Sequence, residues 1–161
     1  MSDWSRRGFR KQKLQTLMGK RINISSGSEF ENLVGYSRAV KVGDIIEVSG
    51  TTALNQKGQV VGINNPYEQT MFILEKIETV LKSLGAVKKD VVRTRMFVTS
   101  IKYWEDVARA HGEFFNNIRP ASTLVEVKSL IFPDLLIEIE VTAMLQDSSV
   151  RSMSMATGCC R

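Results

Sequence analysis

The sequence predicts an α+β fold, a two-layer sandwich in the order β-β-α-β-α-β-β with both helices on one face of a single sheet. Short β-branched runs bounded by turn residues predict the strands, and two longer segments with helical periodicity predict the helices. The chain has 161 residues, which suits one domain, and 43% of them are apolar, which is enough for one core.

The first two strands are predicted over residues 35–41 and 45–50, with a turn at residues 42–44 between them. The second run is rich in β-branched side chains, and residues 51–54 can continue it. A further turn, at residues 55–58, separates this strand from the first helix.

The first helix is predicted from Asn65 to Gly85. Asn65 can cap the helix, Pro66 suits its first position, and Gly85 can end it. Apolar residues recur at three- and four-residue spacing in between. A second helix is predicted over residues 104–116, and Pro120 bars its continuation.

The remaining strands are predicted over residues 91–99, 123–130 and 136–145. In the last two, apolar residues alternate with Glu126, Glu138, Glu140 and Thr142, so several acids share one strand face. No third layer in the sequence covers that face. We therefore expect a partner subunit to cover it, and a homo-oligomer is the usual arrangement.

Charge and composition divide the chain into a basic tail over residues 1–21, a folded domain over 22–147 and a C-terminal tail over 148–161. The first segment alone carries a charge of +6, and the rest of the chain carries −1. We expect the basic tail to be disordered. Because a nucleic-acid-binding domain concentrates positive charge on its folded body, this distribution argues against nucleic acid as a partner.

Targeting signals are weak. Residues 5–9 resemble a twin-arginine signal, but basic residues follow instead of the apolar stretch that export requires. A cytoplasmic location is the expectation, and a mitochondrial presequence is the alternative. No apolar stretch is long enough to span a membrane. Cys159 and Cys160, with the single histidine His111, are too few for a structural metal site, so no metal is expected.

A set of short segments carries a resemblance to a known family. These segments are Gly35-Tyr36-Ser37-Arg38-Ala39-Val40, Val48-Ser49-Gly50, Glu68-Gln69-Thr70, Asp90-Val91-Val92, Phe114-Phe115, Arg119-Pro120-Ala121 and Leu135-Leu136-Ile137-Glu138-Ile139-Glu140. In order and spacing, over about residues 33–145, they resemble the Rid family (reactive intermediate deaminase), also called the YjgF or L-PSP endoribonuclease family.

The resemblance implies a chorismate-mutase-like fold and a homotrimer with small-molecule clefts between subunits. It also implies hydrolysis of reactive imines and enamines to carbonyl compounds and ammonia, with no cofactor. By the same resemblance, Tyr36 and Ser49 are substrate-binding residues. Glu140 matches the final acid of the family's Glu-Ile-Glu strand, which positions water or a proton, and is the predicted catalytic residue.

One departure from the family pattern bears on the substrate. The family's arginine after Pro-Ala, which holds the substrate carboxylate, is Ser122 here, and its asparagine on the second helix aligns with Ala108. The chain therefore resembles an arginine-lacking branch with a non-standard substrate, in which Arg95 or Arg38 could supply the missing charge. A non-catalytic binding or regulatory module using the same cleft is the alternative function. A ribonuclease is a third, disfavoured by the near-neutral body.

Overall fold

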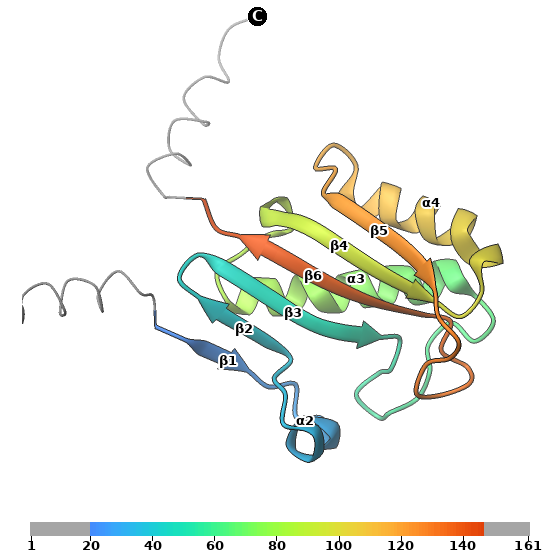
Figure 1. Cartoon of the computed structure of the whole chain (residues 1–161), viewed down its shortest axis with the longest axis horizontal. Coiled ribbons are helices and arrows are strands. Elements are labelled where there is room, and N and C mark those ends of the chain that lie inside the picture. The colour runs from blue at the N-terminus through green and yellow to red at the C-terminus, as the bar shows by residue number, and fades with distance from the viewer. Residues whose placement is uncertain (1–19, 147–161) are drawn as a thin grey trace, which may run out of the picture.

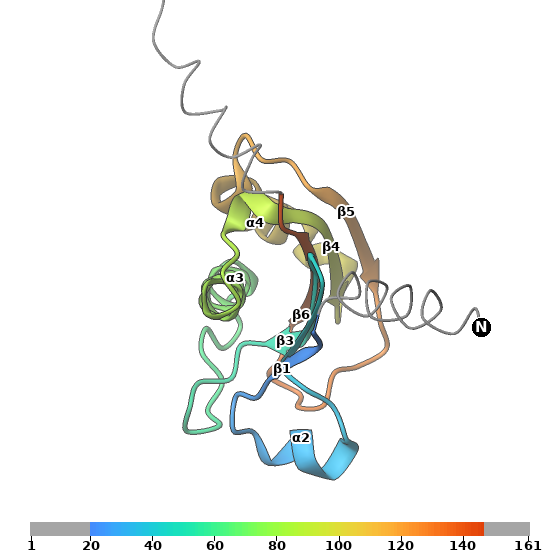
Figure 2. The ribbon, with the colours of Figure 1, turned by 90° about the vertical axis from the view of Figure 1, so that its left-hand side faces the viewer.

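The computed structural model describes residues 20–146, which form one six-stranded sheet with two long helices, α3 (Pro66–Ser83) and α4 (Trp104–Phe115), on one face (Figures 1 and 2). The strands are β1 (Ile22–Ile24), β2 (Ala39–Val42), β3 (Ile45–Thr52), β4 (Val91–Val98), β5 (Ala121–Glu126) and β6 (Ile137–Met144). The predicted α+β fold, with both long helices on one sheet face, is confirmed.

The last strand lies in the middle of the sheet, whose order is β1-β2-β3-β6-β4-β5. All neighbouring strands are antiparallel except β4 and β5, which are parallel. The connection between those two contains α4, as a parallel pair requires. Consequently β3 and β6, which are more than eighty residues apart in the chain, are direct neighbours.

Helix α3 begins where the capping signals predict. The Asn65 side chain accepts a hydrogen bond from the backbone N–H of Glu68 at 3.1 Å, and Pro66 occupies the first turn. The buried Gln69 then ties the helix to the chain before β6. Its amide nitrogen donates to the carbonyl of Asp134 at 2.8 Å, and its amide oxygen accepts from the N–H of Leu136 at 2.9 Å.

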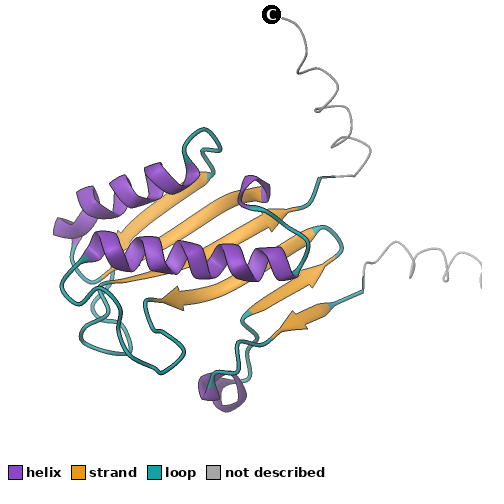
Figure 3. Cartoon of the chain, turned by 180° about the vertical axis from the view of Figure 1, so that it is seen from behind, coloured by secondary structure: helices purple, strands orange, loops and turns teal. Residues whose placement is uncertain are grey.

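The core lies between the helices and the sheet, and β6 shows the alternation that the sequence predicts. Ile137, Ile139, Val141 and Ala143 are buried, whereas Glu138, Glu140 and Thr142 are more exposed. Figure 3 views the sheet from its helical side, and the opposite face has no helical layer over it. Nothing within residues 20–146 covers that open face. It carries Arg93, Arg95 and Val125, all exposed.

Several element boundaries differ from the predictions. The strand expected from residue 35 begins at 39, and the strand expected over 123–130 runs over 121–126. β5 is set by its parallel register with β4, in which Arg93 faces Ala121, so pairing and not local alternation fixes its start. The short β1, helix α2 (Glu29–Val34) and the 3₁₀ turns at Lys88–Asp90 and Ile101–Tyr103 were not predicted.

The predicted tails lie almost wholly outside the described residues, as do Cys159 and Cys160. Within the part of the chain that the structure describes, no helix combines the length and hydropathy of a membrane span.

Candidate functional site

A cavity of about 1570 Å³ opens at the end of the sheet where β3 stops. Its walls come from the N-terminal segment 26–30, the loop 54–59 and the middle of α3. The polar groups that matter most for its chemistry are Tyr36, Arg38, Lys76 and Glu138.

A β-bulge in β3 brings the acid into this cavity. The pairing of β3 with β6 shifts register between Val48 and Thr51, after which Thr52 faces Glu138. Gly50 lies within this bulge, and the Glu138 carboxylate lies directly against its Cα. A Cβ at Gly50 would overlap Glu138 Oε1 and lie 2.9 Å from Cδ, so only glycine permits this approach.

Glu138 is the titratable acid whose surroundings favour its protonated form. It is half-buried, and burial raises the pKa of its carboxyl. The nearby carboxylate of Glu140 raises the pKa further, and Arg38 opposes both effects. A raised pKa brings a carboxyl closer to neutral pH and so favours a role in which it accepts and returns a proton.

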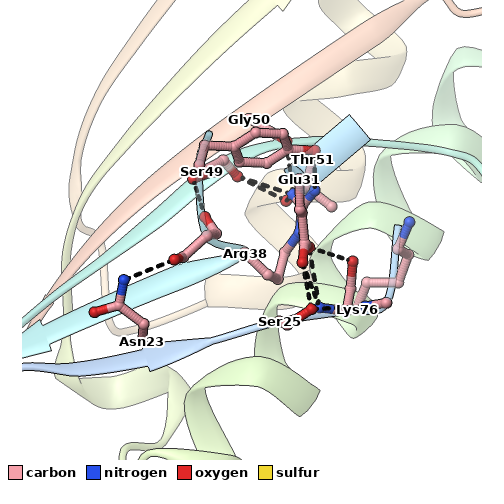
Figure 4. Close-up of polar contacts among 12 residues, drawn as sticks. Asn23, Ser25, Glu31, Arg38, Ser49, Gly50, Thr51 and Lys76 are labelled. Carbon is pink, nitrogen blue, oxygen red and sulfur yellow. Dashed lines mark hydrogen bonds and ion pairs between the residues drawn. The ribbon is translucent and has the colours of Figure 1, made fainter. Parts of the chain in front are cut away.

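Arg38 organises the cavity wall between the bulge and the N-terminal segment (Figure 4). Its Nη1 donates to the carbonyl of Gly50 at 2.7 Å and to Thr51 Oγ1 at 3.1 Å. Its Nη2 donates to the Tyr36 hydroxyl at 3.3 Å, and its Nε lies 3.9 Å from Glu31 Oε1. These contacts occupy both ends of the guanidinium and fix the position of the tyrosine ring.

Glu31, in α2, secures the N-terminal segment to this network. Its side chain is only 4% exposed and accepts hydrogen bonds from the Ser25 hydroxyl at 2.5 Å and the Ser26 hydroxyl at 2.6 Å. Burial raises the pKa of Glu31, but the hydrogen bonds from the two serines and the charge of Arg38 outweigh it and leave the pKa below 4.5. Glu31 is therefore held as a carboxylate.

Lys76 reaches the cavity from α3. Its Nζ donates to the carbonyl of Thr52 at 3.0 Å and to that of Leu54 at 2.7 Å. Burial, with the nearby charge of Arg38, lowers the pKa of Lys76 to about 8. The ammonium also lies 5.6 Å from the centre of the Phe72 ring.

The structure places the residues predicted from the sequence in different regions. Tyr36 lines the cavity. Ser49 does not, because its hydroxyl donates to the carbonyl of Ser37 at 2.7 Å. Glu140 also lies outside the cavity lining, on the open sheet face, where its Oε2 is 3.4 Å from Arg95 Nη1. Both side chains of that pair are more than a third exposed.

Ser122 lies on β5, at the opposite edge of the sheet from the cavity wall. Four strand spacings separate β2 from β5, roughly 20 Å. The Ser122 hydroxyl accepts a hydrogen bond from Thr94 Oγ1 at 3.0 Å, and the same threonine hydroxyl shares a hydrogen bond with His111 Nε2 at 3.0 Å. Burial lowers the pKa of His111, which packs against Phe115. A single chain does not bring Ser122 to Tyr36.

Sequence reasoning assigned no site role to Glu138 and none to Lys76. Glu138 belongs to the same Glu-Ile-Glu strand as Glu140 and shares its face, so only the register with β3 distinguishes the two. No sequence pattern marks Lys76 as a site residue, because a lysine on an amphipathic helix is usually solvated. Among residues 20–146, no three metal-ligating side chains lie together as a candidate metal site.

Comparison with known proteins identifies the family. Residues 26–145 match the family model described as Endoribonuclease L-PSP. The 3-aminoacrylate deaminase RutC of Acinetobacter baylyi is 32% identical over 126 residues, covering 78% of this chain and 98% of that protein. A RutC family protein of Saccharolobus solfataricus is 39% identical over 108 residues, covering 67% of this chain and 85% of that protein.

Solved structures support the same family assignment. The crystal structure of Rv2704 from Mycobacterium tuberculosis, a member of the YjgF/YER057c/UK114 family, superposes with a TM-score of 0.71 at 44% identity. The match covers 78% of this chain and all of that one. The chain therefore belongs to the Endoribonuclease L-PSP family, known also as the Rid or YjgF family.

Proposed function

We propose that this protein hydrolyses reactive imines or enamines to carbonyl compounds and ammonia, with Glu138 as the group that moves the proton. The observation that carries the proposal is the half-buried Glu138 carboxyl, held against Gly50 in a cavity and with a raised pKa. The similarity to a relative named 3-aminoacrylate deaminase supports the same reaction class.

The chemistry needs one acid–base group and water. In an imine, water attacks the carbon of the C=N bond, and Glu138 accepts the proton that the water loses. The protonated carboxyl returns that proton to nitrogen, which gives a carbinolamine with a hydroxyl and an amine on one carbon. Glu138 then transfers the hydroxyl proton to the amine, the C–N bond breaks, and ammonia leaves as the carbonyl forms. An enamine enters the same sequence after protonation on carbon. The Tyr36 hydroxyl, fixed by Arg38, is suited to orient the substrate.

The same proposal includes a homotrimer with the cavity at a subunit boundary. Two features support it: the open sheet face has no cover within the described chain, and Tyr36 and Ser122 lie at opposite edges of the sheet. A site that used both residues would need a second copy. Sedimentation equilibrium of the full chain should give the mass of three chains, and a monomer mass would refute this part.

Imine hydrolysis can be measured directly. An amino-acid oxidase generates imines from a panel of amino acids, and semicarbazide traps the imine that persists. We expect the wild-type protein to reduce trapping, Glu138→Gln to lose that effect by about 10²-fold or more, and Glu140→Gln to keep most of it. The two variants form a matched pair, because both neutralise an acid on the same strand face.

The outcomes separate the candidate functions. Loss of activity in Glu140→Gln but not in Glu138→Gln would return the catalytic role to Glu140. No reduction of trapping by the wild type with any imine would favour the alternative, a binding module that uses the cavity without catalysis. Ser122, a hydroxyl where the family pattern has a guanidinium, is the feature that favours this alternative.

A further inference from the structure

We propose that Lys76 is the cationic anchor of the cavity and holds the carboxylate of an anionic substrate. This inference rests on the proposed function for the identity of the reacting group, but the anion site follows from Lys76 itself. It assigns a specificity-determining role to a residue of α3, outside the sheet that supplies the acid.

The first step is the hydrogen bonding of the ammonium. A lysine ammonium has three N–H donors, and two of them bind the carbonyls of Thr52 and Leu54 at 3.0 and 2.7 Å. These two bonds hold Nζ in place at the cavity wall and leave one donor. No carboxylate lies within 4.0 Å of Nζ among residues 20–146, whereas Lys82 on the same helix pairs with Glu78 at 3.2 Å.

The second step compares Lys76 with the other fixed cation of the cavity. Arg38 already binds the Gly50 carbonyl, Thr51 and Tyr36, and its Nε approaches Glu31. The charge of Arg38 is thus partly offset by the buried carboxylate of Glu31, and its hydrogen bonds hold the residues of the cavity wall together. Lys76 keeps an uncompensated charge, and a half-buried cation without an anion is an energetic cost that a ligand carboxylate would relieve.

A purely structural role accounts less well for a lysine here. Hydrogen bonds to two carbonyls need N–H donors but no charge, and burial has already lowered the pKa of Lys76 to about 8. The charge is therefore the property that the carbonyls do not explain.

The arrangement also orients the substrate. Lys76 projects from α3 and Glu138 from β6, so the two groups line the cavity from different elements. A substrate carboxylate avoids the carboxylate of Glu138 and is attracted to Lys76. We therefore expect the substrate carboxylate at the α3 wall of the cavity. The other charged groups lining the cavity are Glu29, Lys57 and Arg38.

Binding of two small probes to the full chain tests the assignment. Pyruvate carries a carboxylate, and methyl pyruvate is its neutral ester. We expect wild-type protein to bind pyruvate at least 10-fold more tightly than the ester, and Lys76→Met to lose that preference. Lys76→Arg should retain at least part of it. Lys82→Met is the matched control, since it removes a lysine of the same helix that does not line the cavity, and it should behave as wild type.

A second experiment measures the pKa of Lys76 in the wild-type protein, with and without bound pyruvate. NMR of ¹³C-labelled lysine side chains follows the titration of Lys76, whose resonance is assigned as the one missing from both Lys76→Met and Lys76→Arg. Saturating pyruvate should raise the pKa of Lys76 above its free value near 8, because a bound anion favours the ammonium. An unmoved titration, or equal binding of pyruvate and its ester, would overturn the inference. Inorganic phosphate competing as well as pyruvate would overturn the assignment to carboxylates.

Failure of the inference and failure of the proposed function are distinguishable. Imine turnover that depends on Glu138, with pyruvate binding indifferent to Lys76, would refute the carboxylate anchor alone. Pyruvate binding that depends on Lys76, with no imine turnover in any assay, would support the anchor and refute the deaminase.

Discussion

Replacing Gly50 by alanine should displace the acid of the cavity and leave the fold intact. A Cβ at this position would overlap Glu138 Oε1 and lie 2.9 Å from Cδ and 3.3 Å from Cγ. These atoms form the far end of a flexible side chain, so Glu138 can rotate away while the strand keeps its path. Gly50 is not among the glycines with positive φ, and alanine is therefore compatible with its backbone.

The expected magnitudes differ for activity and stability. Moving a reacting group by about 1 Å costs on the order of 10²-fold in rate, so we expect kcat/KM to fall about 100-fold. Crowding costs about 1 kcal/mol when a side chain can yield. Alanine also restricts the unfolded chain, which stabilises the protein by about 0.4–1 kcal/mol. The net change in the free energy of unfolding should thus stay within about 1 kcal/mol.

The semicarbazide assay measures the first quantity, and urea unfolding measures the second. Gly112→Ala is a suitable control, because a Cβ at Gly112 in α4 meets no atom within 4 Å. This control should keep full activity and gain about 0.5–1 kcal/mol of stability. Full activity in Gly50→Ala would refute the reasoning that places Glu138 at the reacting atoms. A loss of several kcal/mol would instead show that the strand, and not the side chain, takes up the clash.

Three further predictions concern stability, each measured by urea unfolding. Burial and Glu140 raise the pKa of Glu138, so its ionisation destabilises the fold as pH rises through the folded pKa. Glu138→Gln should therefore be more stable than wild type at pH 7, with the gain vanishing below about pH 4; a gain independent of pH would contradict this. The pKa of Glu31 is lowered in the folded protein, so its carboxylate contributes to stability above pH 4.5, and this contribution is lost as pH falls through the folded pKa. Glu31→Gln should cost about 1–3 kcal/mol at pH 7 and less at pH 3, and an equal cost at both would exclude the charge as the cause. Asn65→Ala should cost about 1 kcal/mol by removing the cap of α3, and no cost would mean that water replaces the cap.

The parts of the fold that the sequence predicts well are those with local signals. The Asn65-Pro66 start of α3 and the alternation of β6 each depend on neighbours within a few residues, and both are confirmed. The segment before β2 has no such signal. Helix α2 has six residues and is held by the contacts of Glu31 with Arg38 and two serines, which come from tertiary structure and not from periodicity.

The candidate site shows the same division. The family resemblance predicts that the Glu-Ile-Glu strand supplies the catalytic acid and that Tyr36 binds substrate. The structure places Tyr36 in the cavity. Which glutamate enters the cavity depends on the register of β6 with β3 and on the bulge at Gly50. Glu138 and Glu140 are two residues apart on one face, so no local pattern separates them. That information is non-local, and only the folded chain contains it.

Strand pairing fixes one side of the cavity, whereas a loop forms another side. Gly50 and Glu138 belong to paired strands, where an inserted residue would move side chains to the wrong face. The loop 55–59 lies outside the six strands of the sheet, between the bridged residues Leu54 and Val60, and a loop of this kind can change length with little effect on the core. A change in the length or sequence of this loop would therefore alter which molecules fit the cavity and leave Gly50 and Glu138 in place.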